Sequence, residues 1–160
     1  MKKLVLIDGH SILNRAFYGV PELSNSQGLH TNAVYGFLNI MFKILDEEAA
    51  DYIAVAFDLS APTFRHKAYA EYKGTRKSMP DELREQVPLI KDVLSSMNIP
   101  ILTMEGYEAD DIIGTIAKRY QSDEVFVSVI SGDRDLLQLS DKHIKIRIPK
   151  TSKGVTTVHD

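Results

Sequence analysis

The chain has 160 residues, 44% of them hydrophobic, which is enough for a single domain with a buried core. Its formal net charge of −3 gives no support for nucleic-acid binding, so any basic surface must be local. The lack of cysteine excludes disulfides, thiolate metal sites and cysteine nucleophiles. No stretch approaches transmembrane length, and Asp8 interrupts the N-terminal apolar run too early for a signal peptide. We therefore expect a soluble cytoplasmic protein with no membrane partner.

The apolar pattern predicts an α/β fold. Continuous apolar runs rich in β-branched residues predict buried strands at 4–7, 53–57 and 125–130, and shorter runs predict strands at 99–102 and 144–148. Helical spacing of apolar residues predicts helices at 32–47, 80–97 and 108–120, with a kink caused by Pro88. The predicted order is β-α-β-α-β-α-β-β. Right-handed crossovers would place helices on both faces of a mainly parallel central sheet.

Acidic residues gather where these elements meet. Three of the predicted strands are followed by acids, and a further group opens the helix predicted at 108–120; the set is Asp8, Asp58, Glu108, Asp110, Asp111, Asp133 and Asp135. The carboxyl ends of parallel strands share one edge of a sheet, so these side chains should converge there. Mutual repulsion would then require a cation, and a ligand set of oxygens alone suits magnesium or manganese better than zinc. This combination is typical of phosphoryl-transfer chemistry.

Each acidic group also has a purely structural alternative. Asp8 and Gly9 form a pair that is common in turns. Acids from Glu108 onwards suit the first turn of a helix, and Asp133 suits an N-cap. The coincidence of all these groups at one predicted edge favours the metal site.

Two connections are longer than packing requires, at 19–31 and at 59–79, and the second carries most of the local basic charge. Basic and aromatic residues alternate there: Arg65, His66, Lys67, Tyr69, Tyr72, Lys73, Arg76 and Lys77. The segment leaves the sheet directly after Asp58, at the edge where the acids gather. It can hold a phosphate backbone and stack a base, although a solvated loop is the alternative.

Eight motifs occur in order along the chain: LIDGHS at 6–11, RAFY at 15–18, NAVYGF at 32–37, VAFD at 55–58, FRH at 64–66, YKGTR at 72–76, GYEADD at 106–111 and SGDRDLLQL at 131–139. This series resembles the 5′-nuclease domains at the N-termini of bacterial DNA polymerases I. Those domains are relatives of the flap endonucleases and have a PIN-like three-layer fold. The resemblance covers essentially the whole chain.

The resemblance implies roles for individual residues. It implies two Mg²⁺ or Mn²⁺ ions bound by the seven acids named above, with Lys73 and Arg76 joining the first five of those acids as catalytic residues. It also implies contacts with DNA that carries a 5′ end, flap or nick, and we expect these from Arg15, Arg65, Tyr72, Lys73, Arg76 and Lys77.

We accordingly expect residues 1–160 to be the N-terminal part of a 5′-3′ exonuclease domain that hydrolyses DNA phosphodiesters in replication and repair. The helix-three-turn-helix of such domains and the polymerase region of the same polypeptide lie outside this sequence. One alternative is a magnesium-dependent phosphohydrolase, although those enzymes usually carry Asp-x-Asp after the first strand and here Gly9 and His10 follow Asp8. The other is an inactive DNA-binding fragment whose acids hold a structural ion.

Overall fold

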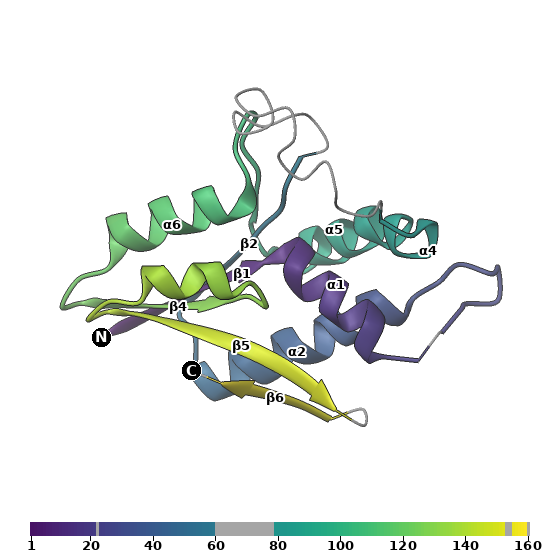
Figure 1. The fold of residues 1–160 in the computed structure, drawn as a ribbon, viewed down its shortest axis with the longest axis horizontal. Helices are drawn as coiled ribbons and strands as arrows, with labels where there is room; N and C mark the ends of the chain where they lie inside the picture. Colours follow the sequence, from purple (N-terminus) through teal and green to yellow (C-terminus); the bar gives the residue numbers. More distant parts are fainter. Residues whose placement is uncertain (22, 60–78, 153–154, 160) are drawn as a thin grey trace.

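The computed structural model describes residues 1–21, 23–59, 79–152 and 155–159. Its described part contains one six-stranded sheet in the order β3-β2-β1-β4-β5-β6 (Figure 1). The strands are β1 (Lys2–Asp8), β2 (Tyr52–Ala56), β3 (Ile101–Leu102), β4 (Val125–Ile130), β5 (Ile144–Ser152) and β6 (Val155–His159). Every neighbouring pair is parallel except β5 and β6. The predicted mainly parallel sheet is confirmed.

Helices cover both faces of the sheet, giving three layers. One face packs against α1 (Gly9–Gly19), α2 (Asn32–Glu48) and α5 (Gln86–Ser96). The other face packs against α6 (Ala109–Tyr120) and the short 3-10 helix η1 (Arg134–Leu139). Figure 1 shows α6 and α2 on opposite sides of the strands. The central strand β1 is apolar on both faces because it is covered on both, with Val5 and Ile7 in one core and Leu6 in the other.

The second predicted helix is interrupted, as Pro88 led us to expect. Residues 81–96 form α4 (Asp81–Arg84) and α5, separated at Glu85. Pro88 has no N–H to offer the carbonyl of Arg84, and its ring clashes with that carbonyl in a regular helix. The break therefore falls one turn before the proline. Within α5, the Gln86 side chain accepts hydrogen bonds from the N–H groups of Ala33 and Val34, at 2.8 and 3.1 Å, and so caps the start of α2.

Three elements are missing from the predicted order: α1, β6 and the short helix η1, which only the N-cap alternative at Asp133 implied. Residues 9–19 form α1, whose buried residues Ile12, Leu13 and Ala16 give an apolar face of less than three turns. Strand β6 pairs antiparallel with β5 and extends the sheet beyond the predicted final strand. The loop predicted at 19–31 begins one residue later, and the described part of it holds only an isolated bridge between Ser24 and His30. In the described part of the chain no helix has the length and apolar content to cross a bilayer.

Candidate metal centre

Asp8 ends the central strand and lies almost entirely inside the protein, with 7% of its surface exposed. Burial is the largest influence on its carboxyl group and raises its pKa from 3.8 to about 6. The Ser131 hydroxyl and the main-chain N–H of Ser11 act in the opposite direction, while the charges of Asp58 and Asp110 raise the pKa further. Three acids from three different elements are thus close enough to influence one another, as the sequence predicted.

Asp58 follows β2 and ties that strand to the start of α6. Its Oδ1 accepts a hydrogen bond of 2.6 Å from the N–H of Ala109. Its own N–H donates to Nδ1 of His10 at 3.2 Å, so the neutral imidazole carries its proton on Nε2. The preceding residue, Phe57, is fully buried, with its ring in edge contact with His10 and 5.2 Å from the Nζ atom of Lys91. These contacts fix the direction in which the chain leaves the strand.

Glu108, Asp110 and Asp111 form the tightest acidic group in the described part of the chain. One carboxylate oxygen from each lies within 4.8 Å of the others, a spacing that one cation can bridge. Glu108 is 3% exposed. Glu108 and Asp111 also form a capping box, each side chain accepting from the other's N–H at the start of α6. The capping alternative is therefore correct for these two acids, but it leaves Asp110 unexplained.

Asp133 and Asp135 are placed differently. Asp133 is the N-cap of η1 and accepts a 2.9 Å hydrogen bond from the N–H of Asp135, so the capping alternative is correct here too. The Asp133 N–H donates to Ser131 Oγ at 3.0 Å, which brings this turn next to Asp8. Among the described residues, neither carboxylate belongs to the acidic group at the start of α6. Their role as metal ligands stays a prediction.

Two glycines make room for this arrangement. Gly9 is the first residue of α1, so the alternative of a turn at Asp8 and Gly9 is wrong. A Cβ at Gly9 would lie 2.5 Å from the buried ring of Phe57, which shows why the residue after Asp8 has no side chain. A Cβ at Gly132 would lie 2.9 Å from Nε of Arg15. The Arg15 guanidinium, a predicted DNA contact, therefore lies over the turn that follows β4.

Three polar residues of this centre were not assigned a role from the sequence. Ser131 donates to the Asp8 carboxylate, Ser11 accepts from the N–H of Gly132, and His10 holds the main chain of Asp58. Ser11 and His10 lie within the motif at 6–11 and Ser131 opens the motif at 131–139, which is the one feature that could have drawn attention to them. The predicted DNA contacts Arg65, Tyr72, Lys73, Arg76 and Lys77 lie outside the described residues.

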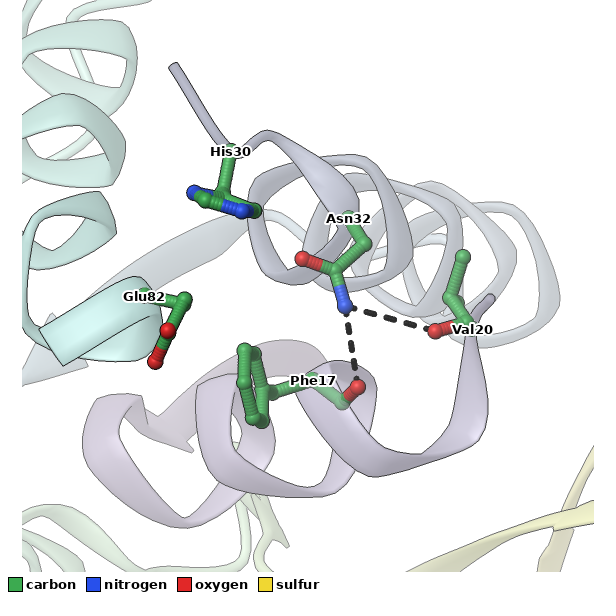
Figure 2. Close-up of a pocket in the computed structure, with 5 residues that line it drawn as sticks. All are labelled: Phe17, Val20, His30, Asn32 and Glu82. Atoms are coloured by element: carbon green, nitrogen blue, oxygen red, sulfur yellow. Dashed lines mark hydrogen bonds between the residues drawn. The ribbon is translucent and has the colours of Figure 1, made fainter. Parts of the chain in front are cut away.

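A separate pocket lies at the far end of α1 from Asp8, lined by Phe17, Val20, His30, Asn32 and Glu82 (Figure 2). Figure 2 shows the amide of Asn32 donating to the carbonyls of Phe17 and Val20, at 3.0 and 3.3 Å. This amide joins the end of α1 to the start of α2. The pocket contains none of the predicted site residues.

Comparison with known proteins places this chain in a family. Residues 3–159 match the model of the 5′-3′ exonuclease N-terminal resolvase-like domain. DNA polymerase I of Bacillus caldotenax is 52% identical over 157 residues, which cover 98% of this chain and 18% of that protein. A 5′-3′ exonuclease of Aquifex aeolicus is 41% identical over 156 residues, covering 98% of this chain and 54% of that protein.

A solved structure agrees with the same assignment. T5 5′-exonuclease with bound divalent metal ions (zinc) superposes with a TM-score of 0.68 and 25% identity, over 92% of this chain and 55% of that one. This match confirms the α/β nuclease fold expected from the sequence. The chain spans about a fifth of the length of its polymerase relatives and about half of the exonuclease relative. With its motifs, its sheet order and its converging acids, the chain belongs to the family of 5′-3′ exonuclease N-terminal resolvase-like domains.

Proposed function

We propose that this chain is the metal-binding part of a 5′-3′ exonuclease that hydrolyses DNA phosphodiesters at 5′ ends, flaps or nicks. The observation that carries the proposal is the buried Asp8 carboxyl, whose pKa is raised to about 6 by burial and by the nearby charges of Asp58 and Asp110. A protein gains nothing in stability from such an arrangement, so its use lies in what the acids bind. The 5′-3′ exonuclease relative supports the same substrate class.

The ion that fits this donor set is Mg²⁺ or Mn²⁺. Every acid in the group offers oxygen, the chain has no thiolate, and Nδ1 of His10, which contacts Asp58, already accepts a hydrogen bond. In the proposal two ions bind. The first is held by Asp8, Asp58, Glu108, Asp110 and Asp111, and the second by Asp133 and Asp135. When bound, divalent ions polarise the phosphoryl group and lower the pKa of water.

The chain's own residues would prepare and orient the substrate. Asp8 would offer a carboxylate oxygen to the ion, and the Ala109 N–H holds the Asp58 carboxylate in place. Arg15, over the turn at Gly132, offers its charge to a backbone phosphate. From their motif, Lys73 and Arg76 would neutralise charge that grows on the scissile phosphate, Tyr72 would stack on a base, and Arg65 and Lys77 would bind the backbone.

The proposal extends to the setting of the domain. Residues 1–160 would be the N-terminal part of the exonuclease domain, with a helix-three-turn-helix and a polymerase region in the same polypeptide. The polymerase relatives support that arrangement, and the proposed role in DNA repair and replication would put the protein in the bacterial cytoplasm.

Incubation with Mg²⁺ and either a 5′-flap duplex or a small phosphate ester tests the proposal. We expect cleavage of the flap substrate, loss of cleavage in Asp110→Asn, and retention in the control Glu105→Gln, which removes an exposed acid in the turn before α6. Turnover of the ester in place of the flap would identify a phosphohydrolase. DNA binding with no cleavage would identify the inactive DNA-binding fragment.

A further inference from the structure

Ser131 connects two acids that lie 125 positions apart in the sequence. It follows β4 directly and is fully buried. Its Oγ donates to Asp8 Oδ2 at 2.9 Å and accepts from the N–H of Asp133 at 3.0 Å. One hydroxyl therefore joins the end of the central strand to the turn that leads into η1.

The direction of these hydrogen bonds follows from the atoms involved. A serine hydroxyl has one proton and two lone pairs, and a main-chain N–H can only donate. Ser131 must therefore accept from Asp133, and its single proton goes to the strongest nearby acceptor, the Asp8 carboxylate. The hydroxyl of Ser11 lies 3.4 Å away and itself accepts a 2.8 Å hydrogen bond from Gly132 N–H. The turn at 131–133 is thus fixed from the side of α1 as well.

We infer that Ser131 is a positioning residue that couples the Asp8 carboxylate to the Asp133 turn, so that the ligands of the two proposed ions are held as one unit. This inference rests on the proposed function. The hydrogen bond fixes one oxygen of Asp8 and so sets the rotation of the whole carboxylate. A change in the position of the Asp8 carboxylate, such as ion binding would cause, is transmitted through Ser131 Oγ to the main-chain N–H of Asp133.

The chain offers a matched control within β4, the strand that leads into Ser131. Ser128 is also buried, at 1% exposure, and its hydroxyl donates to a buried carboxylate, Glu48 Oε2, at 3.1 Å. It lies three residues before Ser131 and has no contact with the acids at the sheet edge among the described residues. Replacing either serine with alanine removes the same kind of hydrogen bond. Only the Ser131 change removes a contact with the proposed metal centre.

The test measures Mn²⁺ affinity by calorimetry and Mg²⁺-induced shifts of main-chain amides by NMR, in wild type, Ser131→Ala and Ser128→Ala. Loss of an outer hydrogen-bond partner of a metal ligand lowers affinity by about 10- to 100-fold, which we expect for Ser131→Ala. Ser128→Ala should lower the melting temperature similarly but keep the affinity within about twofold, since distant sites act independently. At saturating Mg²⁺ the Ala109 amide should shift in all three proteins. The main-chain amide of position 133 is followed in an Asp133→Asn, Asp135→Asn background, which removes the carboxylates proposed for the second ion, so that any shift has to arrive from the Asp8 side. In that background it should shift with Ser131 present and in Ser128→Ala but not in Ser131→Ala.

Two results would overturn the coupling. One is a shift at position 133 that persists with Ser131→Ala in the Asp133→Asn, Asp135→Asn background; the other is an equal loss of Mn²⁺ affinity in both variants, which would show a general effect of stability. These results leave the proposed function intact, because wild type still binds the ion. Wild-type protein that binds neither Mn²⁺ nor Mg²⁺ would instead remove the metal-dependent function and this inference together.

Discussion

Asp8 and Glu48 are both buried carboxylates, yet their surroundings shift their pKa values in opposite directions. Burial is the largest influence on each and raises both pKa values. At Glu48, hydrogen bonds and charges from Lys145 and Lys3, together with the Ser128 hydroxyl, outweigh burial and lower the pKa from 4.5 to about 2. At Asp8, the neighbouring charges are acids, and the pKa rises to about 6. Burial alone therefore does not decide the charge of an acid in this protein.

The difference separates a structural acid from a binding one. Glu48 sits at the end of α2 and receives Lys3, Lys145 and Arg147 at 3.1, 3.1 and 2.7 Å. The chain itself supplies the cations, so this cluster joins α2 to strands β1 and β5. Among the described residues, the charges that act on the Asp8 pKa are those of Asp58 and Asp110, both negative, and a bound cation would compensate them. A buried acid among other acids, at the carboxyl edge of the sheet, is the feature that distinguishes the proposed site from the interior.

Asp8→Asn should cause the largest loss of DNA cleavage and, at the same time, stabilise the metal-free fold. We expect cleavage of flap DNA to fall by about a thousandfold, since bound metal supplies several kcal/mol of transition-state stabilisation. Without metal, the variant should be more stable than wild type at pH 7 by about 3 kcal/mol, the equivalent of the pKa rise to about 6. Urea unfolding in EDTA measures this change. A less stable variant would show that Asp8 is a structural acid like Glu48.

Glu48→Gln should destabilise the fold by about 3–5 kcal/mol, because removing one partner of a buried ion pair leaves the others uncompensated. The cations that would lose the Glu48 charge are Lys3, Lys145 and Arg147, of which Arg147 keeps its ion pair with Glu47 at 2.9 Å. Urea unfolding gives the loss directly. Mn²⁺ affinity of the folded variant, measured below the unfolding temperature, should match wild type, and a large drop would mean that the two clusters are energetically connected.

The pH dependence of stability should show two opposite slopes. The folded-state pKa of Glu48 is depressed, so its contribution is present above pH 4.5 and is lost as the pH falls towards about 2. The folded-state pKa of Asp8 is raised, so the protonated form favours folding, and the metal-free protein loses stability as the pH rises from about 4 to about 6. Thermal unfolding from pH 2 to 8 in EDTA measures both. The loss of stability between about pH 4 and about pH 6 should vanish in Asp8→Asn, and the loss below pH 4.5 should vanish in Glu48→Gln. A slope that persists in its own variant would contradict the comparison of the two acids.

The smallest predicted effect concerns the backbone beside Asp8. Gly9→Ala should cost about 1–3 kcal/mol because the new methyl group overlaps the buried Phe57 ring, and the shift of that ring should weaken Mg²⁺ binding through Asp58. Gly114→Ala is the matched control, since the nearest atom to its Cβ is 3.5 Å away and alanine favours the interior of α6 by about 0.5–1 kcal/mol. The melting temperature should fall in Gly9→Ala and rise in Gly114→Ala, relative to wild type. Equal stability of wild type and Gly9→Ala would show that the ring moves without cost.

The sequence allowed prediction of the strands and of the acids at their ends, because long apolar runs followed by Asp are visible without tertiary information. It did not allow prediction of α1, since Ile12, Leu13 and Ala16 span too few turns and a glycine stands at each end. The helix is stabilised by packing against α2, where a Cβ at Gly36 would come within 2.8 Å of Ala16. Close contacts of this kind arise only from the fold.

The site was predicted in part for a similar reason. Carboxylates carry charge, so several of them at the ends of predicted strands are informative, whereas a neutral serine hydroxyl gives no such signal and that of Ser131 becomes significant only when Asp8 and Asp133 lie beside it. The capping roles of Glu108 and Asp133 were considered as alternatives to metal binding, but each residue can serve the helix with some of its lone pairs and retain others. Helix capping and metal binding are therefore compatible roles for Glu108 and Asp133.

The Ser131 to Asp8 hydrogen bond spans 123 positions in sequence, from Oγ to Oδ2. A ribosome adds about 5–20 residues per second, so a nascent chain exposes Asp8 for on the order of ten seconds before Ser131 has been made. During that interval β1 has no complete β4 beside it, and Asp133 and Asp135 have not been synthesised. If the proposed activity is correct, the order of synthesis alone keeps the emerging polypeptide from cutting nucleic acid before its interior has closed.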